Sequence, residues 1–183
     1  MSYVLTAYVV DIDALSKAVG SGDEQLVTRV IESAPEEFDE DDLDDDELSL
    51  AAALRELVMA GTQSAPESED DAHQYGYALQ SLCRCLGDEL LPEMWAGVRW
   101  EAVEDCGLEE LLTESGPPVP LPENDDFPSI GHLKRGEIDK AIAAARKRLT
   151  KTVDEDIEDL LDEYIDWLEA GRTAHLDMVF FYA

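Results

Sequence analysis

The stretch YVLTAYVV, residues 3–10, decides the fold of this chain. It is dense in β-branched and aromatic residues, and apolar side chains occupy both alternating sets of positions. A strand with apolar side chains on both sides is typical of a sheet whose two faces are both covered. We therefore predict a buried strand over residues 3–10.

The last residues, HLDMVFFYA (175–183), form a second strand candidate that is also rich in aromatic side chains. Two such strands at opposite ends of a chain most simply pair in one sheet. The short segment 129–133 is either an edge strand or a turn. We predict an α+β fold that is predominantly helical, with a small central sheet that pairs the two terminal strands and about six helices that cover it.

Helical periodicity accounts for most of the sequence between these strands. Asp11 is the expected N-cap of the first helix, and Thr152 and Glu155 form a capping box before the last one. Gly171 is the expected end of that last helix. The predicted helices cover residues 12–19, 22–34, 48–60, 73–86, 88–98, 135–149 and 152–171. The pattern over 100–112 is ambiguous, and a helix through Val103 is preferred there.

Length and composition favour a single domain over residues 1–183, with an acidic loop at 36–47 and polar linkers at 62–72 and 114–127. Apolar residues make up 45% of the chain, which is normal for a protein with a packed core. The first ten residues lack the basic start of an export signal, and no apolar run is long enough to span a membrane. Three cysteines are too few for a disulfide framework, so we expect a cytoplasmic protein.

The formal net charge of −31 is the most unusual property of the chain. A field this negative repels nucleic acid and anionic membranes and attracts basic proteins, so we expect neither of the first two as a partner. One basic island, residues 134–151, lies between two acidic blocks. Its expected role is to pair with acids on neighbouring elements, and the alternative is a separate anion-binding site.

The acidic segments are the candidate contact sites for a basic partner. The spacing within 36–47 does not match a calcium-binding loop, because Leu43 interrupts the alternation of acids and no glycine is present. The three cysteines and three histidines lack the spacing of a zinc site, so we predict neither a metal nor a cofactor. The candidate binding residues are Asp39, Asp41, Asp42, Asp44, Asp45, Asp46, Glu69, Asp70 and Asp71.

Three polar residues next to apolar strands are the candidates for lining a pocket: Asp11, His132 and Asp177. Capping and turn formation explain Asp11 equally well. Asp177, a charge inside an apolar strand, is expected at a sheet edge or in an ion pair with the basic island. Aromatic residues could also line a pocket, although core packing is the default for most of them; these are Tyr75, Tyr77, Trp95, Trp100, Phe127, Tyr164, Trp167 and Tyr182.

Four segments carry a resemblance to a known family: VDIDAL (10–15), QYGYALQSLCR (74–84), PVPLPENDDFPSIGHL (118–133) and VFFYA (179–183). With these, most of the chain resembles a family of uncharacterised bacterial domains of unknown function that are loosely similar to the YfbM-like group. The resemblance implies a helix-rich α+β fold whose terminal strand lies beside the first, and it implies no catalytic residues. The acidic insertion at 39–47 departs from the pattern of that family.

Three functions remain open at this point. The first is a protein-binding module whose acidic surface docks on a basic partner, in the manner of an immunity protein or a nucleic-acid mimic. The second is a globular protein whose acidity is an adaptation to high salt. The third is a small-ligand binder or hydrolase with a pocket beside the sheet.

Overall fold

The computed structural model of the chain describes residues 3–38, 48–61, 71–123 and 127–183. These residues form two compact units. The first, which we call the sheet unit, comprises Met1–Ile12, Gly87–Pro118 and Ser129–Ala183, and the second, the helical unit, comprises Asp13–Leu86 and Val119–Pro128. The candidate site lies entirely within the sheet unit.

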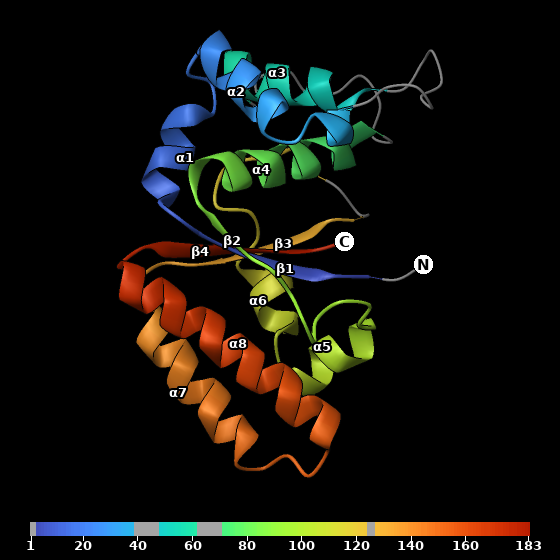
Figure 1. The fold of residues 1–183 in the computed structure, drawn as a ribbon, viewed down its shortest axis with the longest axis vertical. Helices are drawn as coiled ribbons and strands as arrows, with labels where there is room; N and C mark the ends of the chain where they lie inside the picture. The colour runs from blue at the N-terminus through green and yellow to red at the C-terminus, as the bar shows by residue number, and fades with distance from the viewer. Residues whose placement is uncertain (1–2, 39–47, 62–70, 124–126) are drawn as a thin grey trace. The chain divides into compact units, whose positions relative to one another are not determined.

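The sheet unit is built on a four-stranded antiparallel sheet with the order β2-β1-β4-β3 (Figure 1). The strands are β1 (Leu5–Val10), β2 (Asp88–Leu90), β3 (Ser129–Leu133) and β4 (Asp177–Tyr182). β1 pairs with β4 along its full length, from Leu5 opposite Tyr182 to Val10 opposite Asp177. The predicted pairing of the two ends of the chain is thus confirmed, and the predicted α+β class with it.

All six residues of β1 are buried, as predicted for a strand with no exposed face. Five of the six residues of β4 are buried as well, so these two central strands form the middle of the core. Segment 129–133, left open between strand and turn, is an edge strand that pairs with β4. The backbone bonds between Val4 and Ala183 bring the two ends of the chain side by side.

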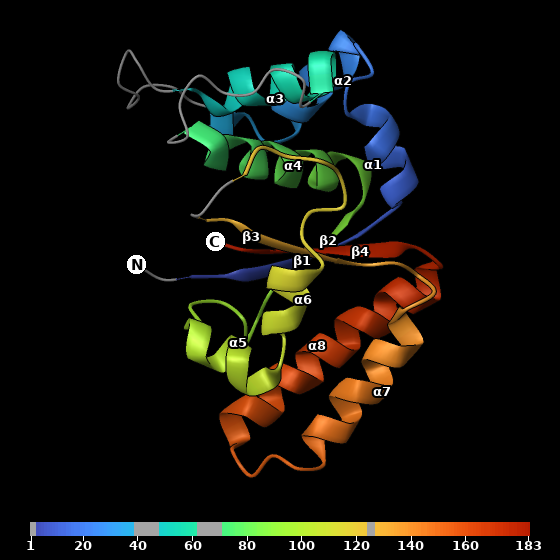
Figure 2. The ribbon, with the colours of Figure 1, turned by 180° about the vertical axis from the view of Figure 1, so that it is seen from behind.

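Four helices of the sheet unit lie on the same face of the sheet (Figures 1 and 2). They are α5 (Trp100–Cys106), α6 (Glu109–Glu114), α7 (Ile138–Leu149) and α8 (Glu155–Ala174). α7 and α8 form an antiparallel hairpin, in which Arg146 of α7 pairs with Glu169 of α8 at 2.9 Å. This ion pair agrees with the internal role expected for the basic island.

The helical unit contains α1 (Ile12–Ala18), α2 (Glu24–Ser33), a 3-10 turn (Pro35–Phe38), α3 (Leu50–Ala60) and α4 (Ala72–Leu86). Gly20 and Gly61 approach each other so closely that a Cβ on Gly61 would lie 3.6 Å from the Cα of Gly20. Both glycines have positive φ, which other residues rarely adopt. Their contact joins the end of α1 to the end of α3.

The helix predicted over residues 88–98 is wrong. Residues 88–90 form β2 on the edge of the sheet, and 91–98 is a loop in which Trp95 is fully buried while Leu91 is 75% exposed. Gly87 explains the change, since a Cβ there would lie 2.5 Å from the carbonyl oxygen of Val9, so only glycine lets the chain pass this close to β1. The free edge of β1 then offers backbone partners that outweigh the helical pattern.

The helix predicted over 100–112 is two helices, because Gly107 adopts the left-handed conformation and ends α5.

The ends of α8 also differ from the prediction. Its N-cap is Asp154, whose carboxylate accepts from the backbone of Asp156 and Ile157, and Thr152 instead accepts from the N–H of Asp154. α8 also continues past Gly171 to Ala174.

Asp177 lies on a central strand, so the expected edge position is wrong. Its two carboxylate oxygens accept backbone N–H groups from Ile12 at 3.1 Å and from Arg135 at 2.8 Å. Asp177 therefore meets the basic island through a backbone N–H of that segment. Within the sheet unit, this carboxylate therefore joins Ile12 to the turn that follows β3.

No helix within the described residues combines the length and the apolarity needed to cross a membrane.

Candidate functional site

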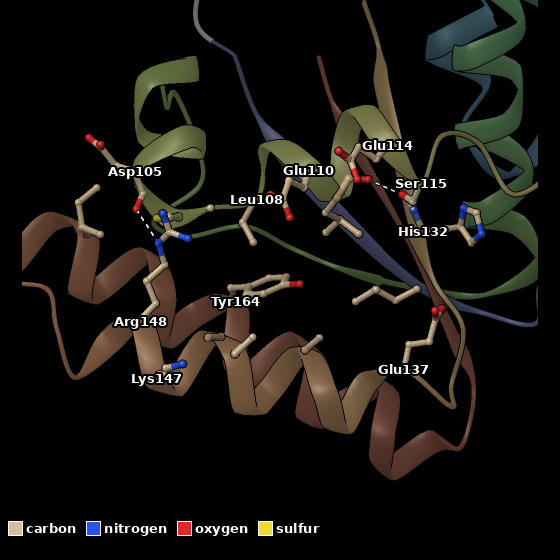
Figure 3. Close-up of a pocket in the computed structure, with 18 of the residues that line it drawn as sticks. Asp105, Leu108, Glu110, Glu114, Ser115, His132, Glu137, Lys147, Arg148 and Tyr164 are labelled. Atoms are coloured by element: carbon tan, nitrogen blue, oxygen red, sulfur yellow. Dashed lines mark hydrogen bonds between the residues drawn. The ribbon is translucent and has the colours of Figure 1, made fainter.

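A groove of about 1220 Å³ lies between α5 and α6 on one side and the α7–α8 hairpin on the other (Figure 3). All the residues that line it belong to the sheet unit. β3 and the turn after it close one end, and the end of α7 with residues 151–152 closes the other. Binding sites in small proteins are usually concave and formed between packed elements, so this groove is the candidate site.

The floor of the groove is apolar. α7 contributes three alanines, of which Ala145 is buried and Ala144 is exposed. Because an alanine side chain ends at Cβ, these positions leave open the space that a larger residue would fill. The remaining apolar lining residues come from four other segments and are Cys106, Leu108, Leu111, Leu133 and Ile157.

Tyr164 of α8 carries the most informative polar group in the groove. Its side chain is only 4% exposed, and its hydroxyl points into the middle of the groove (Figure 3). Within the described residues no hydrogen bond is formed by this hydroxyl. Burial raises the pKa of the phenol above its ordinary value, so Tyr164 remains protonated and is an O–H donor at neutral pH.

Arg148 and Gly107 form one end of the groove. The guanidinium of Arg148 donates from Nε to the carbonyl of Asp105 at 3.0 Å and from Nη2 to that of Glu104 at 3.4 Å, so it caps the carboxyl end of α5. Gly107 makes this possible, since a Cβ there would collide with the guanidinium. Burial raises the pKa of the neighbouring Cys106 thiol to about 12, an effect that Arg148 opposes and Asp105 reinforces. The thiol is therefore neutral at pH 7 and a poor nucleophile.

Ser115, His132 and Glu137 form the opposite end. The Ser115 hydroxyl donates to the carbonyl of Leu111 and accepts the backbone N–H of His132 at 3.0 Å. Nδ1 of His132 lies 2.8 Å from the carbonyl oxygen of Gly116, and the imidazole ring points away from the groove (Figure 3). The serine and histidine side chains are thus engaged with the backbone rather than with each other, which does not suit nucleophilic catalysis.

The rim of the groove carries charges of both signs. Lys147 and Lys151 lie toward the Arg148 end together with Asp105, whereas Glu110 and Glu114 lie on the α6 wall. Lys134 and Glu137 lie at the far end, where the Glu137 carboxylate accepts the backbone N–H of Lys134 at 3.0 Å. Within the described residues, neither Lys147 nor Lys151 has an ion-pair partner, and the carboxylates of Glu110 and Glu114 have none either. The groove therefore presents charges that the protein itself does not neutralise.

The structure places the predicted pocket residues in two locations. His132 lines the groove through the end of β3, whereas Asp11 and Asp177 lie outside its lining. Asp11 is exposed and adjoins β1 at the point where Val10 pairs with Asp177. Of the predicted pocket residues, only His132 therefore contributes to the groove, together with Tyr164 from the set of aromatic residues.

Most of the predicted acidic contact residues, Asp39, Asp41, Asp42, Asp44, Asp45, Asp46, Glu69 and Asp70, lie outside the described residues. Asp71 is described, and its carboxylate accepts the backbone N–H of Leu48 at 3.2 Å, near the start of α3. In the part of the chain that the structure covers, no three His, Cys, Asp or Glu side chains are grouped so that they could hold a metal ion.

Sequence reasoning did not single out Ala144, Lys147, Lys151 or Glu110 as site residues. One signal for the two lysines was the basic island 134–151, whose alternative role was a separate anion-binding site. For Ala144 the signal was the run AIAAARKRL (141–149), in which small residues occupy positions where an amphipathic helix usually carries large ones. By itself this run is also typical of a helix that packs closely on a neighbour. The position of α6 opposite α7 decides between the two.

Comparisons with known proteins give one result. No curated protein and no solved structure matches this chain. A family model described as a domain of unknown function, DUF7691, matches residues 1–183. The resemblance to bacterial domains of the YfbM-like group is not tested by this match and stays a prediction. Because the model covers the whole chain, the protein belongs to the DUF7691 family of domains of unknown function.

Proposed function

We propose that this protein binds a small molecule in the groove between α6 and α7. The observation that carries the proposal is the Tyr164 hydroxyl, a donor on a side chain that is 4% exposed, has no protein acceptor within the described residues and points into the groove. No fully buried side-chain nitrogen or oxygen in the described residues lacks a hydrogen-bond partner, so the Tyr164 oxygen itself is reached by solvent from the groove. The hydroxyl is therefore a donor that an entering molecule can use.

The rest of the groove supports binding rather than catalysis. Its floor is apolar and its rim polar, which is the usual composition of a ligand site. The Cys106 thiol is neutral at pH 7, and Ser115 and His132 are held by backbone contacts, so neither the thiol nor the serine is an activated nucleophile. The groove can thus hold and orient a molecule without attacking it.

The test is a screen of small molecules by thermal shift, followed by titration of the compounds that raise the melting temperature. We expect Ala144→Trp to abolish the shift, because Ala144 is exposed on the floor and an indole there fills the groove. Tyr164→Phe removes only the hydroxyl, so we expect affinity to fall roughly tenfold, as for one lost buried hydrogen bond.

Ala143→Trp is the matched control for this prediction. Ala143 neighbours Ala144 on the same helix and is exposed, but it does not line the groove. We expect Ala143→Trp to bind like the parent protein. Equal binding by the Ala144→Trp and parent proteins would contradict the proposal.

A second candidate function is docking of a basic protein partner, and the outer face of α8 favours it. Glu155, Asp159, Asp162 and Asp166 recur at helical spacing along one side of α8, and all four are exposed. Carboxylates in such a row attract a cationic surface and raise its rate of encounter. The net charge of −31 acts in the same direction over longer distances.

Poly-L-lysine is a suitable probe for the second candidate. We expect its affinity to fall at least tenfold between about 0.05 and 0.5 M salt, because exposed charges are screened over this range. Neutralising the four α8 acids to their amides should weaken binding more than neutralising Glu101, Glu104, Glu109 and Glu123, which are also exposed. Equal losses would show that only net charge matters. A melting temperature that requires molar potassium chloride would favour adaptation to salt instead.

A further inference from the structure

We propose that the ligand of the groove is an elongated zwitterion with the chemistry of a short peptide with free ends. Its carboxylate lies toward Lys147 and Lys151, and its ammonium group lies toward Glu110 and Glu137. This inference rests on the proposed binding function and assigns the class and the direction of the bound molecule.

Charge is unevenly distributed along the groove. Lys147, Arg148 and Lys151 outnumber Asp105 at one end, and Glu114 and Glu137 outnumber Lys134 toward the other, with the Tyr164 hydroxyl between the two ends (Figure 3). Glu137 is the N-cap of α7 and Lys147 lies in its last turn, so about 15 Å of helix axis separates them at roughly 1.5 Å per residue. An extended peptide of about four or five residues spans this distance, at roughly 3.3–3.6 Å per residue.

Several charged side chains that line the groove remain unpaired. Within the described residues, Lys147, Lys151 and Glu110 have no ion-pair partner, although a molecule with this excess of acids offers many carboxylates to each lysine. The basic residues in the last turn of α7 also interact favourably with the partial negative charge at its end. Lys151 lies beyond that helix end, at the closing wall of the groove. A ligand carboxylate there would be the partner of its ammonium group.

Ligands with a single kind of charge fit the groove less well. An anion is attracted by Lys147 and Lys151 but repelled by Glu110, Glu114 and the field of the whole molecule. A polycation is attracted by that field but repelled by the lysines and Arg148 inside the groove. A zwitterion held in the proposed direction has a favourable partner at both ends.

The middle of the groove suits the backbone of a peptide. The Tyr164 hydroxyl is a donor and meets an acceptor there, and a peptide carbonyl is an acceptor at mid-length. Around it, the floor of Ala141, Ala144 and Ala145 lets an extended backbone approach α7 closely. The charged ends of the groove therefore match the charged ends of a short peptide. The Tyr164 donor and the apolar floor match the peptide backbone between those ends.

The test is isothermal titration of the full chain with penta-alanine at low salt, beside the N-acetylated and the C-amidated peptides. We expect the peptide with two free ends to bind, and each blocked end to weaken binding roughly five- to tenfold, since each removes one set of exposed ion pairs. Lys147→Gln should abolish the effect of C-amidation, and Glu110→Gln should reduce that of N-acetylation.

Matched controls exist on the same helices. Lys140 on α7 and Glu109 on α6 are exposed but do not line the groove, so Lys140→Gln and Glu109→Gln should bind all three peptides like the parent protein. Absence of penta-alanine binding, or equal affinity for free and blocked peptides, overturns this inference. The groove itself remains supported in that case if Ala144→Trp removes the binding of compounds from the screen, and both proposals fail if it does not.

Discussion

Gly131→Ala is expected to lower the free energy of unfolding by about 3 kcal/mol, as overpacking between rigid elements does. Gly131 lies on β3 opposite Phe180 of β4, where α6 crosses the strand. A Cβ at this position would lie 2.9 Å from the carbonyl carbon of Leu111 and 3.1 Å from the Cα of Leu112, and closest to the Leu111 carbonyl oxygen. All three atoms are backbone, so no side chain can rotate to relieve the clash.

The same substitution should also impair ligand binding, because Leu111 lines the groove and α6 forms its wall. Urea unfolding measures the stability and the thermal-shift screen measures the binding. Gly136→Ala is the control, since nothing lies within 4 Å of a Cβ there and its φ is not positive; we expect a change of at most about 0.5 kcal/mol. If the two alanine variants unfold at the same urea concentration, α6 does not contact β3 as described.

Glu163→Ala is expected to cost about 2–3 kcal/mol of stability, a large effect for a carboxylate that is only partly buried. The Glu163 side chain accepts the backbone N–H groups of Glu93 at 2.6 Å, Met94 at 2.8 Å and Trp95 at 3.1 Å. It therefore anchors the loop of residues 91–98 to α8. The Trp95 indole strengthens the anchor by donating to the carbonyl of Leu160 at 2.9 Å.

Loss of the carboxylate leaves three backbone N–H donors without their acceptor. Because the same loop carries the fully buried Trp95, loosening of the loop also disturbs the core. Thermal unfolding measures the loss of stability, and a red shift of tryptophan emission is expected if the loop loosens. Asp162→Ala is the matched control, because Asp162 is the neighbouring residue on α8 and is exposed. We expect that control to be neutral or slightly stabilising, since it reduces the repulsion among acids. Similar losses in both variants would contradict the anchoring role.

Prediction of the fold from sequence was most accurate where the apolar pattern of a segment also showed how the segment is buried. Residues 3–10 are apolar on both sides, so they had to lie at the centre of a sheet, and the aromatic C-terminal strand was the natural partner. The prediction failed where a helical spacing of apolar residues competed with pairing to a strand. Residues 88–90 follow a helical spacing, yet they form β2 because Gly87 brings the chain against the free edge of β1.

The groove shows the same limit for the site. The residues that line the groove come from five elements. No local spacing in the sequence connects Tyr164 of α8 with Glu110 of α6 or Lys147 of α7. The aromatic residues that could line a pocket included Tyr164, but nothing in the sequence separates its open hydroxyl from those of tyrosines packed in the core. The basic island was expected to pair internally, and Arg146 does, whereas Lys147 and Lys151 line the groove.

By itself, the sequence determined the class of the fold, the pairing of its two ends and the excess of negative charge, because each follows from composition or from a local period of apolar residues. Tertiary structure alone decided which donor is left without an acceptor and which charges share one groove. The physical reason is that an unused hydrogen-bond donor or an unpaired charge depends on what lies opposite the side chain, and in this protein residues of α6 and α7, which are separate in the sequence, line the same groove.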